Sequence, residues 1–245
     1  MIILTIGMEV IISSQMYQFL MTTRVCFITL PPPIVYEAVD LGLPSGTLWA
    51  SQNVGARKPS DYGLYFAWGE TQGYTAEQVG TGSGKKAFSF GDYKWYLSGE
   101  DDSGNSTIKY KKYTTPSATL ELEDDAAHVN MGGDWCMPTP DQIQELINTA
   151  NTTTAWTTSD GVSGMTFTST KDTSKSIFIP AASGPWNGLL EMVGENVELF
   201  SSILSTNDIE RPQAVFLDSK HAIFYDGDVV RYGGCTVRGV IGEIK

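Results

Sequence analysis

Few residues of this 245-residue sequence have the types and spacing that covalent catalysis requires. A hydrolase needs a nucleophile with a base within hydrogen-bond reach. Ser201, Ser202 and His221 are the side chains that could provide such a pair. No strand–turn–helix elbow is predicted around these serines. We therefore expect a protein that is not an enzyme.

The cysteines and histidines do not form a metal-binding pattern. Cys26, Cys136 and Cys235 are too few and too scattered for a disulfide framework. The sequence has no CxxC motif, and its two histidines, His128 and His221, lie far apart. Cys136 and Cys235 could pair if their segments lie side by side, but free buried thiols are the favoured interpretation.

Two acidic segments could offer oxygen ligands to calcium. They are residues 123–125 and the tripeptide Asp226-Gly227-Asp228. Neither matches an EF-hand loop, so calcium use has no motif to support it. The first is better interpreted as charge at a helix N-terminus, and the second as a turn. We expect no cofactor.

The segment between residues 122 and 149 predicts two helices separated by a glycine turn. Residues 123–131 should form the first helix, which Gly132-Gly133 would end. Thr139 should cap the second, at residues 140–149, with Gln142 three positions later completing a capping box. These helices provide a frame and no catalytic centre.

Alternation of apolar and turn residues predicts several antiparallel strands. Residues 39–54 and 156–169 read as hairpins, whereas the aromatic residues of 61–68 predict a core segment of helical or turn character. Residues 71–119 form a long irregular excursion. Further strands are expected at residues 176–180, 197–203, 214–217, 221–225, 229–232 and 236–240, with a polar loop at 207–212.

Composition narrows the classes of partner. The net charge of −12 argues against nucleic acid, because a phosphate backbone requires a basic surface. No apolar run reaches the roughly 20 residues that a membrane span needs. Residues 1–35 differ from the remainder and end in three prolines. They are interpreted as an N-terminal docking or homo-oligomerisation segment or, equally well, as extra strands on the domain of residues 36–245.

Five ordered blocks carry a resemblance to a known family. The block EDDAAHVNMGGDWCMPTPDQIQEL at residues 123–146 is similar to a central motif of the Fibrobacter succinogenes major paralogous domain, which is widespread in Bacteroidetes and their phages. Further blocks match at residues 39–50, 53–71, 177–182 and 235–240. The sequence departs from the family at Cys136, usually Arg, and at Gly239, usually Pro.

The resemblance implies an α+β, C-type-lectin-like fold, in which two helices pack on twisted antiparallel sheets with long irregular loops. This scaffold is related to formylglycine-generating enzymes, so an enzyme of that type is one alternative. Those enzymes use a pair of reactive cysteines near the C-terminus, and only Cys235 lies there. A structural adhesin or decoration module is the other alternative. Arg238 lies in a block that the family buries, and we interpret it as structural.

Members of this scaffold class also serve as variable proteins of diversity-generating retroelements. Adenine mutagenesis of AAC codons cannot produce Trp, Met, Lys, Gln or Glu, and residues 221–235, HAIFYDGDVVRYGGC, contain none of these five. The same segment should turn alternate aromatic and apolar side chains outward. The competing interpretation is an ordinary buried hairpin.

The resulting hypothesis is a non-enzymatic ligand- or receptor-binding protein with a variable C-terminal surface. Its expected partner is a protein or glycan on a host or neighbouring cell, and its expected location is extracellular, on a bacterial surface or a virion. The predicted ligand-binding residues are Trp186, Asn187, Asp208, Arg211, His221, Ile223, Phe224, Tyr225, Asp226, Asp228, Val230, Arg231 and Tyr232.

Overall fold

A computed structural model of the protein describes residues 32–100, 106–227 and 229–242. The chain divides into two units, Met1–Pro33 and Ile34–Lys245, and the fold lies in the second. The predicted N-terminal docking segment falls mostly outside the described residues. None of the helices within the described ranges is long and apolar enough to cross a membrane.

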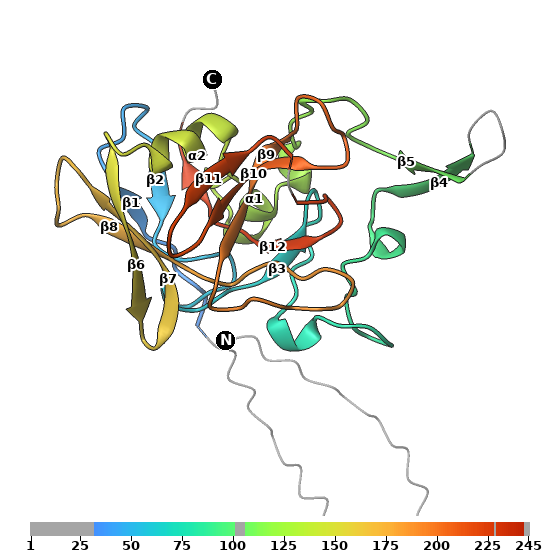
Figure 1. The fold of residues 1–245 in the computed structure, drawn as a ribbon, viewed down its shortest axis with the longest axis horizontal. Coiled ribbons are helices and arrows are strands. Elements are labelled where there is room, and N and C mark those ends of the chain that lie inside the picture. Colours follow the sequence, from blue (N-terminus) through green and yellow to red (C-terminus); the bar gives the residue numbers. More distant parts are fainter. Residues whose placement is uncertain (1–31, 101–105, 228, 243–245) are drawn as a thin grey trace, which may run out of the picture. The chain divides into compact units, whose positions relative to one another are not determined.

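The described part of the chain is mostly sheet, with two short α-helices (Figure 1). This agrees with an α+β class at the coarse level. The helices are α1 (Ala126–Met131) and α2 (Pro140–Ile147). Single 3-10 turns occur at Ala76–Gln78, Phe90–Asp92 and Leu122–Asp124.

The strands of the described residues form four sheets. The largest has the order β11–β10–β9–β12–β3, with bounds Ala222–Tyr225, Pro212–Leu217, Val197–Leu204, Gly234–Thr236 and Tyr65–Ala67. A three-stranded sheet joins β1 (Ala38–Asp40), β2 (Leu48–Ala50) and β13 (Val240–Ile241). Another joins β6 (Thr152–Ser159), β7 (Val162–Ser169) and β8 (Ser176–Pro180), and β4 (Tyr96–Glu100) pairs with β5 (Ser106–Tyr110). Within the described residues these strands pair antiparallel, apart from a short parallel contact between β9 and β12.

The second predicted helix is confirmed together with its cap. The Thr139 side chain accepts a hydrogen bond from the Gln142 backbone, and the Gln142 side chain accepts one from the Thr139 backbone. The first predicted helix is shorter than expected. Asp125 adopts an extended conformation and caps α1, where its carboxylate accepts hydrogen bonds from the backbone N–H groups of His128 and Met137. A carboxylate that is engaged in this way ends the preceding 3-10 turn.

The hairpin predictions hold where the turn chemistry is local. β1 and β2 pair across a turn closed by Gly46 N–H and the Leu43 carbonyl. β6 and β7 pair across Asp160-Gly161, both of which have positive φ (49° and 82°), as a type I′ turn requires. β8 spans the predicted residues.

Four sequence-based predictions of secondary structure are wrong. Residues 71–119 were expected to be irregular, but they contain two 3-10 turns and the hairpin of β4 and β5. Residues 61–68 belong to the core, as expected, but they contain strand β3 where helical or turn character was predicted. Residues 229–232 are a loop and not a strand, because the buried Arg231 side chain and its backbone bond to Glu210 draw the segment inward. Residues 236–240 are divided between β12 and β13, which lie in different sheets.

The frame around the largest sheet is densely packed. Helix α2 packs against β9, β10 and β11 (Figure 1). Trp49, Trp68 and Trp135 are buried, as a rigid aromatic frame requires. Arg238 is also buried and donates hydrogen bonds to Asn53 Oδ1 and to two backbone carbonyls, which confirms its structural role.

Candidate ligand-binding groove

One face of the largest sheet is only partly covered. In the register of β9, β10 and β11, Phe216 stands between Glu198 and Ile223, so these three side chains lie on the same face. Phe216 and Glu198 are half-buried and Ile223 is exposed. The opposite face carries Val197, Leu199 and their neighbours, which belong to the main core.

A groove of about 470 Å³ lies beside this face. The loop between β8 and β9 forms one wall, and the loop between β11 and β12 forms the other. We call it the Trp186 groove, and it is lined by Ser183, Gly184, Pro185, Trp186, Leu189, Glu191, Met192, Glu198, Arg211, Val229, Val230, Gly233 and Gly234. Trp186, Leu189 and Met192 are 57%, 59% and 52% exposed. Large apolar side chains that are exposed and clustered together are typical of a binding surface.

A tight turn presents the exposed tryptophan. Trp186 and Leu189 exchange two backbone hydrogen bonds of 2.9 Å, which leaves Asn187 and Gly188 as the two central residues. Both have positive φ, 49° and 75°, as a type I′ turn needs. The Asn187 N–H also donates to the Phe88 carbonyl at 3.2 Å. The turn is therefore held on both sides and keeps Trp186 directed outward.

The groove is lined by one arginine and two glutamates. Arg211 forms an ion pair of 2.9 Å with Asp208, so its charge already has a partner. Glu191 is exposed at the rim, and Glu198 lies on the sheet. The Glu198 carboxylate lies over Gly184, where a Cβ would come within 2.6 Å of Oε2. A glycine is needed there to leave room for the carboxylate.

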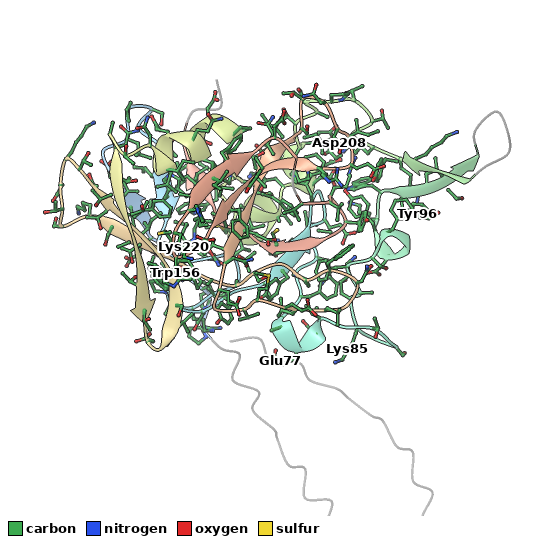
Figure 2. The ribbon with its side chains drawn as sticks, viewed as in Figure 1. Glu77, Lys85, Tyr96, Trp156, Asp208 and Lys220 are labelled. Carbon is green, nitrogen blue, oxygen red and sulfur yellow. The ribbon has the colours of Figure 1, made fainter. Side chains whose placement is uncertain are left out.

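A second cavity, of about 370 Å³, adjoins the groove, and Met192 lines both. Its walls include Trp156, Phe216, Asp218 and Lys220. Figure 2 shows Trp156 and Lys220 together, with Asp208 at the other end of the strands. His221 lies next to this cavity, where its Nδ1 is 3.1 Å from Asp218.

The structure brings several of the predicted site residues to this surface. Trp186, Arg211 and Val230 line the groove, and Asn187 and Asp208 support it. Ile223 and the half-buried Tyr225 follow on the same face of β11, since residues two apart on a strand share a face. His221 reaches the second cavity through Asp218. Asp226 is exposed and accepts a hydrogen bond from the Thr206 backbone, whereas Asp228 lies outside the described residues.

Three of the aromatic and charged predictions need correction. Arg231 is 0% exposed and cannot contact a ligand from its position. Phe224 packs against the main core, because it alternates with Ile223 and Tyr225 on β11. Tyr232 is half-buried and packs edge-on against Phe90, with ring centroids 5.4 Å apart. Arg231 and Tyr232 thus help to hold the loop between β11 and β12 in place, and Phe224 holds β11 on the core; none of the three lines the Trp186 groove.

Sequence reasoning missed several residues of the groove. Leu189 and Met192 appear in the sequence as apolar residues of an irregular loop, and only the tight turn shows that they share a surface with Trp186. Glu198 interrupts the apolar strand Val197-Glu198-Leu199-Phe200. A single charged residue in such a strand was the one signal for an open position on the sheet face.

The acidic segment that could have held calcium is occupied by a lysine. Lys112 Nζ lies 2.7 Å from Glu121, 3.4 Å from Glu123 and 2.6 Å from Asp124. These three carboxylates are the only group within the described residues arranged closely enough for a metal ion. The ammonium group already supplies the positive charge that they require.

Two of the candidate catalytic groups make contacts within the protein. Ser201 is buried and donates a hydrogen bond to the Ile203 carbonyl, while His221 pairs with Asp218. Cys136 and Cys235 are free and buried, as the favoured interpretation held. Burial raises the pKa of Cys136 to about 11, and burial together with Glu198 raises the pKa of Cys235. Both groups are therefore thiols near neutral pH, whereas the thiolate is the reactive form.

Comparison of the chain with protein-family models, with curated proteins and with solved structures finds no match. The function of the Trp186 groove must therefore be inferred from its own geometry and chemistry. Its geometry combines an exposed apolar wall, a tryptophan presented by a tight turn and a carboxylate among the lining residues.

Proposed function

We propose that this protein is a non-enzymatic binding protein whose ligand contacts the Trp186 groove. One observation carries the proposal: the loop between β8 and β9 exposes Trp186, Leu189 and Met192 along one wall of a groove that lies beside the largest sheet. Large side chains held in one conformation provide contact area at a low entropy cost. We also propose that the domain is C-type-lectin-like, on the support of the five ordered sequence blocks.

The diversified-surface hypothesis belongs to the same proposal. Its support is the residue content of positions 221–235 and the exposure of His221, Ala222, Ile223 and Asp226. These four side chains can change without altering the core, whereas Arg231 and Cys235 cannot. The proposed partner is a protein or glycan on another cell, met at a bacterial surface or a virion.

Binding can be tested by selecting ligands from unbiased collections. The protein would be screened against a phage-displayed random peptide library and a printed glycan array. Ligands selected in this way should lose binding to Trp186→Ala and Val230→Glu, by about tenfold or more for a central aromatic contact. Leu97→Ala is the matched control, because Leu97 is a 44% exposed apolar residue of β4 outside the groove. Ligands that bind all these variants equally would overturn the proposal.

The diversification hypothesis has a separate test. Sibling copies of the gene would be sequenced, together with their flanking regions. Variation confined to about residues 200–232, with a near-identical template repeat and a reverse transcriptase gene nearby, is the expected result. Substitutions spread evenly over the chain would contradict it and leave the binding proposal to be judged by the groove variants.

A further inference from the structure

The sheet of β6, β7 and β8 ends at a long edge strand. β6 has 8 residues, whereas the other edge strands of the described residues have between 2 and 5. Its pairing with β7 runs from Thr152 to Ser159 without a register shift, so no bulge interrupts it. Figure 1 shows the end of β6 and its turn at the margin of the fold. A long, regular edge of this kind is a template for pairing with another strand.

Alternate residues of β6 point their backbone groups away from the sheet. In an antiparallel pair, one residue exchanges both hydrogen bonds with its partner and the next residue exchanges none. The Thr170 N–H donates to the Asn151 carbonyl in the same register, so the odd-numbered residues of β6 bond to β7. Thr154, Trp156 and Thr158 therefore direct their N–H and C=O groups outward. These groups make no hydrogen bond within the described residues.

The side chains of β6 do not protect this edge. Proteins discourage edge pairing with a charge, a proline or a bulge. The strand TTTAWTTS at residues 152–159 contains no charged residue and no proline. Its threonines and its tryptophan are residues that favour strands. The exposed side chains are those of Thr153, Thr154, Ala155 and Thr158. The edge is therefore open to a partner strand.

The residue order of β6 matches a second copy of itself. An antiparallel pair about a twofold axis at Trp156 engages every outward residue, because Thr154 then lies opposite Thr158 of the partner subunit. Cross-strand threonine pairs are favourable. The strand is neutral, and Asp160 in the turn beyond it pairs with Lys58 at 2.9 Å. In a chain with a net charge of −12, two copies can meet here without bringing unpaired carboxylates face to face.

We propose that the protein forms a twofold-symmetric homodimer through the edges of two β6 strands, which join the two sheets into one. This surface differs from the N-terminal segment that the sequence suggested for homo-oligomerisation. None of the β6 residues lines the Trp186 groove, so the inference goes beyond the proposed function. A dimer carries two grooves and binds a ligand with repeated sites more tightly than a monomer does.

Sedimentation velocity of the full chain at increasing concentration measures the dimer. The parent protein should convert from monomer to dimer. Association should be tighter in about 0.5 M NaCl than in about 0.05 M, because salt screens the repulsion between two acidic chains. Combining Thr154→Lys with Thr158→Lys places lysines opposite each other on both sides of the axis. The dissociation constant of the dimer should then rise by about tenfold or more, because like charges directly opposite are destabilising.

A charge-swap variant tests the register of the two strands. When Thr154→Lys is combined with Thr158→Glu, each lysine faces a glutamate of the partner subunit. The dissociation constant should return to within about threefold of the parent value. Thr114→Lys with Thr115→Lys is the matched control, because both positions are exposed and lie outside β6. It adds the same two positive charges and should not weaken the dimer.

Amide hydrogen exchange identifies the backbone groups that pair. The amides of Thr154, Trp156 and Thr158 should exchange rapidly in dilute protein and at least about tenfold more slowly in concentrated protein. The amides of Ala155 and Thr157 bond to β7 and should be protected at both concentrations. This measurement uses the parent protein, so it decides the question even where a variant does not fold.

Three results would overturn the inference. One is a monomer at every concentration, and another is a dimer that the folded double-lysine variant leaves intact. The third is a monomer that binds extended peptides from a random library and loses them in the double-lysine variant, because the edge would then receive a foreign strand. Thermal unfolding curves establish that each variant is folded. Binding of ligands to Trp186→Ala is measured separately, so the proposed function stands or fails by its own test.

Discussion

Arg231 offers the sharpest test of how the groove is supported. Its guanidinium group donates to Tyr93 Oη at 2.9 Å, to the Tyr113 carbonyl at 2.9 Å, to the Ile209 carbonyl at 3.1 Å and to the Lys112 carbonyl at 3.2 Å. Its Cζ also lies 4.2 Å from the centroid of the Tyr110 ring. One side chain thus ties the loop between β11 and β12 to the excursion of residues 71–119.

Replacing this side chain by an apolar one of similar length allows a magnitude to be worked out. Arg231→Met removes all four hydrogen bonds. The bonds to Tyr93 and to the Tyr113 carbonyl are fully buried, whereas the other two are part-buried and can be replaced by water. A buried acceptor that loses its partner costs about 1–3 kcal/mol, and the lost cation–π contact adds about 1 kcal/mol. The free energy of unfolding should therefore fall by about 3 kcal/mol at least, the lower end of this sum.

The measurement is urea and thermal unfolding followed by circular dichroism. A loss of about 3 kcal/mol corresponds to a Tm lower by about 6–12 °C in a domain of this size. Arg231→Lys retains the charge with fewer donors and should lose about half as much. The surface variant Arg211→Met provides the comparison, with an expected loss below about 1 kcal/mol. If Arg231→Met unfolds within about 2 °C of the parent protein, Arg231 is not the buried tie inferred from its contacts.

Three further predictions follow from single positions. Burial alone would raise the pKa of Asp124, but hydrogen bonds from two lysines and a tyrosine hold it below its ordinary value. The stability that this lowered pKa contributes is present above the unfolded carboxyl pKa of about 3.9 and is lost as the pH falls below it. In urea unfolding, the stability difference between the parent protein and Asp124→Asn should therefore shrink between pH 7 and pH 3. A difference that stays constant over this range would refute the prediction. Gly164→Ala should lower the free energy of unfolding in urea by about 2 kcal/mol or more, because a Cβ would lie 2.3 Å from a backbone carbonyl of β8. Gly91→Ala is the control: its Cβ would meet no atom within 4 Å, and stability should change by less than about 0.5 kcal/mol. The third prediction concerns Cys136, because burial raises the pKa of its thiol to about 11. In a Cys26→Ser background at pH 8, Cys136 should react with an aromatic disulfide reagent far more slowly in the folded protein than in urea. Equal reaction rates in the two states would contradict its burial.

Elements with local signals were the most predictable from sequence. The capping box of Thr139 and Gln142 and the turn at Asp160-Gly161 each depend on residues within four positions of one another. Patterns of this kind determine the conformation wherever the surroundings do not oppose them. The helix at residues 123–131 was only half right, because Asp125 is also engaged by Met137, beyond the helix.

Arg231 shows why part of the candidate site could not be predicted. In the sequence it stands among aspartates and glycines and looks like an exposed residue. Its buried acceptors at Tyr93 and Tyr113 lie more than a hundred positions earlier in the sequence, and no local pattern predicts these contacts. Trp186 was among the predicted ligand-binding residues, but the groove beside it depends on how separate loops meet. Burial of a charged side chain is a property of the tertiary fold.

The excursion of residues 71–119 supports both walls of the groove through main-chain atoms. The Asn187 turn is held by the Phe88 carbonyl, and Arg231 is held by the carbonyls of Tyr113 and Lys112. Every amino acid supplies a carbonyl oxygen, so the identity of the side chain at these anchor points is immaterial to the bond itself. These carbonyl bonds would survive substitution of the residues that supply them, but the bond from Arg231 to Tyr93 Oη and its contact with the Tyr110 ring would not. The excursion must therefore keep those two side chains for the walls to hold their spacing.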